Sequence, residues 1–265
     1  MEIIVAPHAG FCSGVDRAFR IAVNITDKEN PIYILGDIVH NSAVIARLKE
    51  HGIKTIKEIS ELISLPTGTV IVRTHGAPPQ TFAEIEKLGF KIVDATCPIV
   101  RKVQQLAQQL KDQGYRVVIV GEKNHPEIQG VLGWVDGDAI VIEEAADVAK
   151  INKGERVGVV VQTTQSLDKF KAIEDTILKR TQDVKIENTI CSAIAKSQKA
   201  AMELAAKVDV MIVIGDPKSA NTRRLAELCA EKVATHRIET AAEIDAAWFR
   251  NKAKTGVTAG TSTPQ

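Results

Sequence analysis

The sequence is poor in aromatic residues, carries almost no net charge and contains no long apolar run. Aromatic side chains make up 4% of its 265 residues, which disfavours the stacking platforms on which nucleic-acid bases bind. The formal net charge of +1 leaves no basic surface for nucleic acid or for an anionic membrane. No apolar run reaches the roughly 18 residues that span a membrane. We therefore expect neither a nucleic-acid partner nor a membrane partner.

The N-terminus and the cysteine spacing exclude two further classes. The segment MEIIVAPHAG has neither the basic region nor the apolar region of a secretory signal, so we predict a cytoplasmic location. Thiols stay reduced there, and the four cysteines are better explained as ligands, nucleophiles or core residues than as disulfides. The sequence has no Cys-x-x-Cys pair, unlike most structural zinc sites.

Strand-like runs rich in Val and Ile alternate with longer amphipathic segments along the chain. The expected strands are Ile3–Ala6, Ile32–Leu35, Thr69–Arg73, Lys91–Val93, Arg116–Gly121, Ala139–Ile142, Arg156–Val161, Val184–Glu187, Val208–Gly215 and Thr255–Ala259. The expected helices are 14–25, Asn41–His51, Pro79–Leu88, Ile99–Asp112, Ser166–Arg180, Ala193–Lys207 and Asn221–Lys232. This alternation predicts an α/β fold of mainly parallel sheets covered by helices on both faces.

Three cysteines mark a degenerate internal repeat of about 90 residues. Cys12, Cys97 and Cys191 each follow a strand-like run and precede a helix-like segment. The residues 28 positions further on are His40, His125 and Ser219, and a third strand in each copy ends near His75, Thr163 or Ser262. The repeat predicts three α/β units, 14–97, 98–191 and 192–265 with 1–13. We expect them to form a trefoil around a central metal-cluster site, because ligands gather at the carboxyl ends of parallel strands.

The three junction cysteines have the chemistry of metal ligands. Soft thiolates select zinc, copper(I) or iron–sulfur clusters. An iron–sulfur cage usually has four cysteines, so three would leave one iron open to a substrate. Cys229 lies in the middle of a helical pattern and is expected in the core.

The polar strand ends suggest an anion site. His40 and His75 each lie just before a helix start, where unpaired N–H groups and the helix dipole attract anions. Ser219, Asn221 and Ser262 add donors at other strand ends, although an ordinary helix N-cap explains Ser219 or Asn221 equally well.

The segment His125-Pro126-Glu127 places an ionisable pair on one loop. A carboxylic acid in a closed site has a raised pKa and can donate a proton. Glu127 is therefore the candidate proton donor, with the Thr163 hydroxyl relaying or orienting that proton.

With these residues in view, the chain resembles the 4-hydroxy-3-methylbut-2-enyl diphosphate reductase family, also called the LytB or IspH family. The matching blocks are AGFCSGVDRA, DIVHN, RTHGA, DATCPIVRKV, NHPEIQG, QTTQS, SANTRRLAEL and GVTAGTSTP. They run from end to end of the chain in the family's order. Two departures are Ala220, where the family often has a second serine, and Gln104, where it often has a histidine.

The resemblance implies one 4Fe-4S cluster per chain with three cysteine ligands, Cys12, Cys97 and Cys191, and one open iron. It implies that His40, His75, His125, Thr163, Ser219, Ala220, Asn221 and Ser262 bind the substrate. Glu127 matches the family's proton donor, aided by Thr163 and His125. The implied reaction is the reductive dehydroxylation of 4-hydroxy-3-methylbut-2-enyl diphosphate, a small allylic diphosphate, to isopentenyl and dimethylallyl diphosphate. Electrons would come from an external donor such as ferredoxin or flavodoxin.

Two other classes of function fit parts of the pattern. A divergent three-cysteine iron–sulfur paralogue with another substrate, such as a dehydratase like quinolinate synthase, would use the open iron without outside electrons. A zinc-stabilised binding module would use the cysteines without catalysis. Iron, acid-labile sulfide and reductant dependence distinguish the three.

Overall fold

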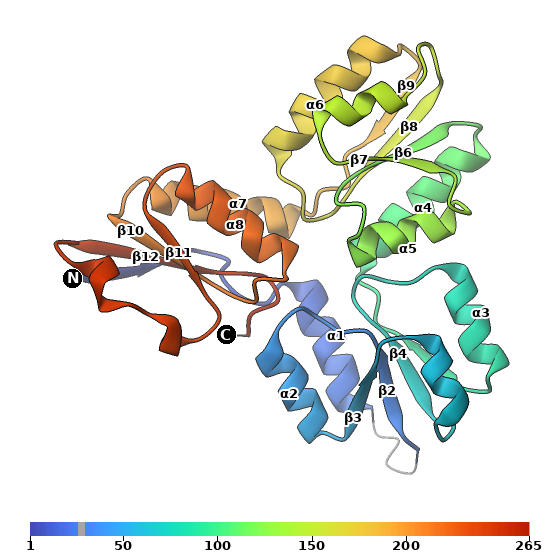
Figure 1. Cartoon of the computed structure of the whole chain (residues 1–265), viewed down its shortest axis with the longest axis horizontal. Helices are drawn as coiled ribbons and strands as arrows, with labels where there is room; N and C mark the ends of the chain where they lie inside the picture. The colour runs from blue at the N-terminus through green and yellow to red at the C-terminus, as the bar shows by residue number, and fades with distance from the viewer. Residues whose placement is uncertain (26–29, 265) are drawn as a thin grey trace. The chain divides into compact units, whose positions relative to one another are not determined.

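The computed structural model describes residues 1–25 and 30–264, which form three four-stranded sheets (Figure 1). The chain divides into two compact units. Unit 1 comprises Met1–Asp16, Val39–Arg47 and Cys191–Gln265, and unit 2 comprises Arg17–Ile38 and Leu48–Ile190. Gln265, the last residue of the third predicted α/β unit, lies outside the described residues. The boundaries of the three predicted units stay a prediction.

Strands and helices alternate through the described residues. The strands are β1 (Glu2–Val5), β2 (Ile32–Leu35), β3 (Ile53–Ile56), β4 (Thr69–Val72), β5 (Lys91–Asp94), β6 (Arg116–Val120), β7 (Ala139–Ile142), β8 (Val157–Val161), β9 (Val184–Glu187), β10 (Val210–Ile214), β11 (Thr235–Ile238) and β12 (Lys254–Ala259). The α-helices are α1 (Ser13–Asn24), α2 (Ser42–Glu50), α3 (Pro79–Lys87), α4 (Pro98–Asp112), α5 (Pro126–Trp134), α6 (Leu167–Arg180), α7 (Ser192–Ala205) and α8 (Ala220–Ala230). Short 3-10 helices are η1 (Ile59–Ser64), η2 (Ala145–Lys150), η3 (Ala241–Glu243) and η4 (Ala246–Phe249).

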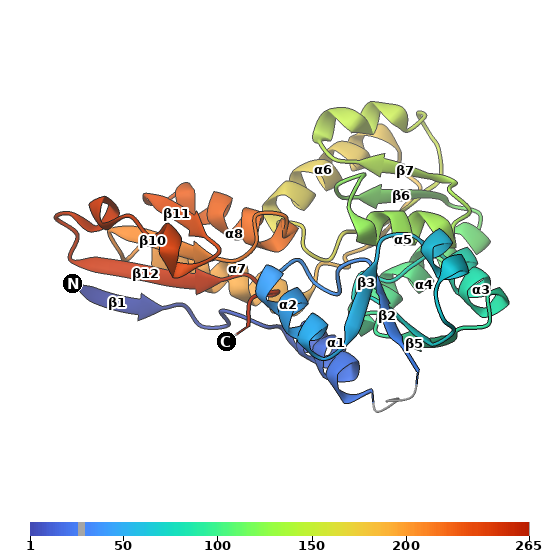
Figure 2. The ribbon, with the colours of Figure 1, turned by 60° about the horizontal axis from the view of Figure 1, so that its bottom comes forward.

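The three sheets share one topology, which confirms the predicted repeat of parallel α/β units. Sheet A has the order β1-β12-β10-β11, sheet B β3-β2-β4-β5 and sheet C β7-β6-β8-β9. Every pair of neighbouring strands in the described residues is parallel. The first strand of the chain, β1, completes sheet A beside β12 (Figure 2). Both chain ends therefore contribute to one sheet.

Sheet C shows how the apolar runs position the helices. Successive side chains of a strand point to opposite faces of a sheet. Val118 of β6 packs with Phe170 of α6 on one face, and Ile119 packs with Leu110 of α4 on the other. Because both faces are covered, β6 and β8 are apolar at almost every position, as expected for buried parallel strands.

Sheet A is covered less completely in the described residues. Helices α7 and α8 cover one face, where Met211 and Val213 pack against Leu225 (Figure 1). On β1, by contrast, Ile3 and Val5 are each 63% exposed. The expectation that helices cover both faces holds for sheet C and only in part for sheet A.

Besides the four short 3-10 helices, the sequence pattern missed two strands and one α-helix that the structure contains. Strands β3 and β11 are four-residue edge strands with charged or polar positions, so they lack the apolar runs of central strands. Helix α5 carries Gly130 and Gly133 in its interior, which weakens a sequence-based helix prediction. Within the described residues, no helix is both long and apolar enough to cross a bilayer.

Candidate active site

The nine strand-end residues of the predicted repeat all follow the carboxyl ends of parallel strands. These residues are Cys12, His40, His75, Cys97, His125, Thr163, Cys191, Ser219 and Ser262. Unit 1 holds Cys12, His40, Cys191, Ser219 and Ser262, and unit 2 holds the other four. The carboxyl edge of a parallel sheet is where such folds bind ligands, so we describe each unit's strand-end residues in turn.

The centre of the polar group in unit 2 is a buried carboxyl group on α5. The Glu127 side chain is 1% exposed. One of its oxygens accepts a hydrogen bond from the backbone N–H of Thr163 at 2.7 Å, and the other accepts one from the Thr163 hydroxyl, also at 2.7 Å. Two donors from one residue thus fix the plane and position of the carboxyl group.

Burial raises the pKa of Glu127 to about 7, even though both hydrogen bonds from Thr163 act to lower it. Desolvation disfavours the carboxylate, whereas the hydrogen bonds favour it. A carboxyl group with this pKa is largely protonated slightly below neutral pH and can donate a proton there. These are properties that a proton donor needs, and the role of Glu127 stays a prediction.

His125 forms the N-cap of α5, and its Nδ1 accepts a hydrogen bond from the backbone N–H of Glu127 at 3.2 Å. A nitrogen that accepts this bond carries no proton, so the ring proton of neutral His125 lies on Nε2. The His75 and His125 rings meet edge to face, with centroids 5.2 Å apart. Three predicted site residues of unit 2 are thus held together at the start of α5.

Cys97 connects to this group through the backbone. It is the N-cap of α4, and its N–H donates to the carbonyl of Thr74, the residue before His75, at 2.9 Å. The Cys97 side chain is half-buried. Its thiol therefore lies at the N-terminus of a helix.

Unit 1 holds the serines and the asparagine. Ser219 is the N-cap of α8: its hydroxyl oxygen accepts a hydrogen bond from the N–H of Thr222 at 3.4 Å, and the Ser262 hydroxyl lies 3.4 Å from it. The Asn221 side chain is 3% exposed, and neither its nitrogen nor its oxygen has a hydrogen-bond partner among the described residues. Ala220 is buried beside them as the first residue of α8. Unpaired polar groups at a helix N-terminus suit an anionic ligand.

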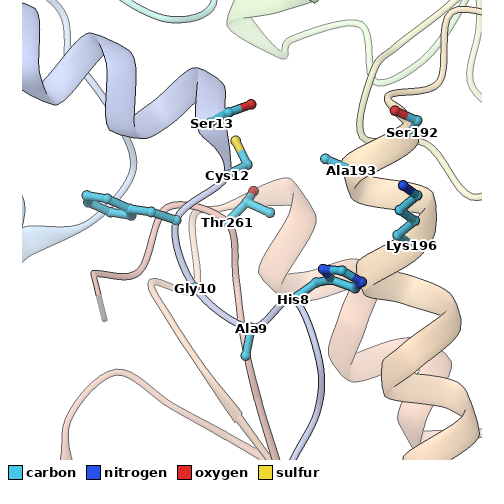
Figure 3. Close-up of a pocket in the computed structure, with 10 residues that line it drawn as sticks. His8, Ala9, Gly10, Cys12, Ser13, Ser192, Ala193, Lys196 and Thr261 are labelled. Atoms are coloured by element: carbon cyan, nitrogen blue, oxygen red, sulfur yellow. The ribbon is translucent and has the colours of Figure 1, made fainter.

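Cys12 lines a pocket of about 500 Å³ in unit 1. Figure 3 shows Cys12 and Ser13 on one side of it and Ser192, Ala193 and Lys196 of α7 on the other. Burial raises the pKa of the Cys12 thiol, backbone N–H groups of the first turn of α1 oppose that rise, and the charge of Cys191 adds to it. Cys12 and Cys191 therefore lie within reach of each other's charge in unit 1.

His40 is half-buried and directly precedes Asn41, whose side-chain oxygen accepts a hydrogen bond from Val44 N–H at the start of α2. The predicted position of His40 before a helix start is therefore confirmed. Cys229 is fully buried in the core of unit 1, and burial raises its pKa to about 11. This agrees with the expectation that Cys229 is a core residue.

The cysteines fit an iron–sulfur cluster in chemistry and in local setting. Each of the three is half-buried and lies at the start of a helix, and thiolates are the ligands that iron–sulfur clusters require. Among the residues that the structure describes, no three His, Cys, Asp or Glu side chains form a ready metal site. Since two cysteines belong to unit 1 and one to unit 2, the meeting of all three at one cluster stays a prediction.

Sequence reasoning missed one side chain that supports these groups, Gln162. The Gln162 side chain accepts from Glu122 N–H at 2.8 Å and donates to the Thr164 hydroxyl at 2.9 Å, which braces the loop that carries Thr163. Gln104 is fully buried in α4. The motif QTT pointed only to Thr163, and the sequence singled out Gln104 only as a departure from the family's histidine.

A carboxyl group with a pKa shifted by burial is a frequent feature of catalytic sites, and this one lies at the carboxyl edge of a parallel sheet. The fold and the site thus define an α/β enzyme. Similarity narrows this class: the chain belongs to the LytB protein family, whose model matches residues 3–265.

Individual relatives agree with the family. A 4-hydroxy-3-methylbut-2-enyl diphosphate reductase of Geobacter metallireducens is 46% identical over 266 residues, which cover 100% of this chain and 93% of the relative. The reductase of the same name from Pelobacter propionicus is 44% identical, with 100% and 94% covered.

Two solved structures also match. The structure of (E)-4-hydroxy-3-methyl-but-2-enyl diphosphate reductase, the terminal enzyme of the non-mevalonate pathway, has a TM-score of 0.73 and 42% identity over 100% of this chain and 95% of that one. The E-1-hydroxy-2-methyl-but-2-enyl-4-diphosphate reductase of Plasmodium falciparum has a TM-score of 0.93 and 27% identity, covering 99% of this chain and 84% of that one.

Proposed function

We propose that this chain reduces 4-hydroxy-3-methylbut-2-enyl diphosphate to isopentenyl and dimethylallyl diphosphate, the last step of non-mevalonate isoprenoid synthesis. Two electrons and two protons cleave the terminal carbon–oxygen bond, release its oxygen as water and form one carbon–hydrogen bond at either end of the allylic unit. The observation that carries the proposal is the buried Glu127 carboxyl group, held by Thr163 and protonated near neutral pH. Relatives named 4-hydroxy-3-methylbut-2-enyl diphosphate reductase match the whole chain.

The donors of unit 1 would hold the diphosphate. Asn221 offers a buried amide that has no other hydrogen-bond partner in the described part of the chain. Ser219 and Ser262 offer hydroxyl groups 3.4 Å apart, and Ala220 contributes a backbone N–H at the N-terminus of α8. His40 and His75, each after a strand end, would add donors to the anion.

The group in unit 2 would move the proton. Glu127 donates it to the hydroxyl oxygen of the substrate, which then leaves as water. Thr163 keeps the carboxyl group in position through two hydrogen bonds. His125, whose Nδ1 is engaged by the start of α5, can offer only its Nε2–H as a donor while neutral, so we assign it to orienting the hydroxyl group.

A 4Fe-4S cluster on Cys12, Cys97 and Cys191, with one iron open to the substrate, would supply the electrons and a Lewis acid. An external one-electron carrier such as ferredoxin or flavodoxin would reduce it. Burial of Glu127 and Asn221 keeps water from the proton donor and from the diphosphate contacts.

The deciding experiment is anaerobic purification followed by iron and sulfide analysis and a reductant-dependent assay with the diphosphate. We expect about four irons and four sulfides per chain and turnover only with a reductant. Cys97→Ser should lose iron, whereas Cys229→Ala, a core cysteine on α8, should keep it. A Cys97→Ser protein with a full cluster would remove Cys97 from the ligand set.

The same experiment addresses the alternatives. A dehydratase like quinolinate synthase would turn over its own substrate without a reductant, and a zinc module would carry zinc and no sulfide. Neither is favoured, because the full-length relatives are reductases. The electron carrier and the cytoplasmic location stay predictions.

A further inference from the structure

Gln104 is a fully buried amide that its protein surroundings do not satisfy. Its side chain lies on the inner face of α4 and is 0% exposed. Neither its nitrogen nor its oxygen has a hydrogen-bond partner among the described residues. Burying an amide without a partner costs on the order of 1–3 kcal/mol, so a ligand, a water or a function is expected to use it.

The Gln104 amide lies between the His75 loop and helix α5. A Cβ atom on Gly76 would lie 2.4 Å from Gln104 Nε2. Gly76 also has φ +71°, so both its conformation and the close approach require glycine. On the other side, a Cβ atom on Gly130 of α5 would lie 3.4 Å from both Gln104 Nε2 and the His75 carbonyl oxygen. The Gln104 amide thus borders the His75 loop and α5 at a glycine of each, Gly76 and Gly130.

The same loop and helix are packed together beyond Gln104. A Cβ atom on Gly133 would lie 2.4 Å from the ring of Pro78. The Trp134 indole donates to the Ala77 carbonyl at 3.1 Å. These contacts are apolar or lie toward the end of α5, whereas the Gln104 amide borders α5 at Gly130, nearer its start. Gly130 is one turn from Glu127 on the same helix face, so the amide lies close to the catalytic end of α5.

The repeat places a second glutamine at the equivalent position. Gln104 follows Cys97 by seven residues, and Gln198 of α7 follows Cys191 by seven. The Gln198 side chain is 6% exposed, and its Nε2 also lacks a partner in the described chain. Helices α4 and α7, which each begin at a cysteine predicted to bind the cluster, therefore each carry a buried amide two helical turns after that cysteine.

We propose that Gln104 is a positioning residue. Its amide, through one ordered water shared with the His75 carbonyl, holds the His75 loop in register with α5. That register sets where His75 lies relative to His125 and Glu127. The inference rests on the proposed function, because it assigns His75 and Glu127 to one reacting substrate. A polar site bounded by a donor and a carbonyl oxygen is the kind that ordered water occupies.

The test separates positioning from stability. Gln104→Leu removes one neutral hydrogen bond to the ordered water, which contributes about 0.5–1.5 kcal/mol, and also removes the cost of burying the amide. Its melting temperature should therefore stay within a few degrees of that of the wild type. Its iron content should not change. The KM for the diphosphate substrate and the Kd for inorganic diphosphate should nevertheless rise about tenfold, and kcat should fall, because the loop loses its register.

The controls use the same helix. Gln105 is exposed beside Gln104, so Gln105→Leu should leave all these quantities unchanged. Gln104→Met, which keeps the length of the side chain, replaces the leucine variant if that variant does not fold. Gln104→Glu keeps the shape and, while the buried acid is protonated, also a donor and an acceptor. The KM of this variant should therefore be close to that of the wild type at low pH and should rise as pH rises.

Ring signals of His75 and His125 in NMR spectra of the isotope-labelled protein give a readout that does not depend on turnover. They should move in Gln104→Leu and stay in place in Gln105→Leu. Unmoved signals together with KM and kcat within about twofold of the wild type would overturn the proposal, as would a loss of activity that only follows a lower melting temperature. A wild type without iron–sulfur or reductase activity would instead overturn the proposed function, and the NMR comparison would still decide the role of Gln104.

Discussion

The two units differ in whether their buried polar side chains have hydrogen-bond partners. In unit 2, Thr163 occupies both oxygens of Glu127, and Glu127 N–H occupies Nδ1 of His125. In unit 1, Asn221 is just as buried, yet neither of its amide atoms has a partner in the described residues. Proton transfer needs a donor fixed before the substrate arrives, whereas anion binding needs donors that remain available. The contrast indicates a prearranged acid in one unit and a receptive anion site in the other.

The largest effect should come from removing the acid. Glu127→Gln keeps the shape and lets Thr163 bond to one side-chain oxygen, but it cannot donate the proton. We expect kcat to fall by about 10³-fold, within the range for general acids, with an unchanged Kd for inorganic diphosphate and unchanged iron content. If the variant instead lost diphosphate binding while keeping kcat, the division of labour between the units would be wrong.

The pH dependence of stability should reveal the same group. Burial raises the folded-state pKa of Glu127 from 4.5 to about 7, so the folded protein holds a proton that the unfolded chain releases. Its stabilising contribution is full below pH 4.5 and is lost as pH rises through about 7, a decline of about 3 kcal/mol. Urea unfolding at several pH values should show this decline in the wild type and not in Glu127→Gln. Equal pH profiles for the two proteins would contradict the raised pKa.

The titration of Glu127 should also limit kcat at alkaline pH. The acid must be protonated, so kcat should fall as pH rises through about 7. The two Thr163 hydrogen bonds lower this pKa, so Thr163→Val, which removes one of them, should move the midpoint to higher pH. The measurement is the pH profile of kcat for both proteins, and a shift to lower pH would argue against Thr163 as a partner of the carboxylate.

A change in the anion site of unit 1 should alter the affinity for the diphosphate. Asn221→Leu removes a buried amide without a partner, so we expect an unchanged or higher melting temperature. The KM for the substrate should rise about tenfold, the loss of one good hydrogen bond to an anion. Calorimetric titration with inorganic diphosphate checks the binding directly. A fall in kcat at constant KM would place Asn221 with the proton-transfer group instead.

Ser262→Ala should have the smallest effect. Its hydroxyl lies 3.4 Å from that of Ser219, which remains as the N-cap of α8. We expect KM to rise only about threefold, since a neutral hydrogen bond contributes about 0.5–1.5 kcal/mol. An effect as large as that of Asn221→Leu would show that Ser262 holds the diphosphate more directly than its neighbour.

The sequence by itself determined the parallel α/β class, the positions of the strand ends and the nine residues that follow them. Apolar runs and turn residues are local signals, and they recur in each copy of the repeat. The ends of central strands and long helices were therefore predicted to within about two residues. Glu127 and Cys229 were also assigned from their local setting. Edge strands β3 and β11 and the glycine-containing α5 were missed because pairing and packing, rather than local preference, stabilise them.

Only the tertiary structure decided which polar groups are satisfied. A sequence cannot show that Thr163 takes both oxygens of Glu127, that Asn221 is left without a partner in the described chain, or that Gln104 lies between Gly76 and Gly130. Burial and hydrogen bonding arise between residues far apart in the chain. Since desolvation and such distant partners set the pKa of a buried acid, its chemistry is a property of the folded molecule.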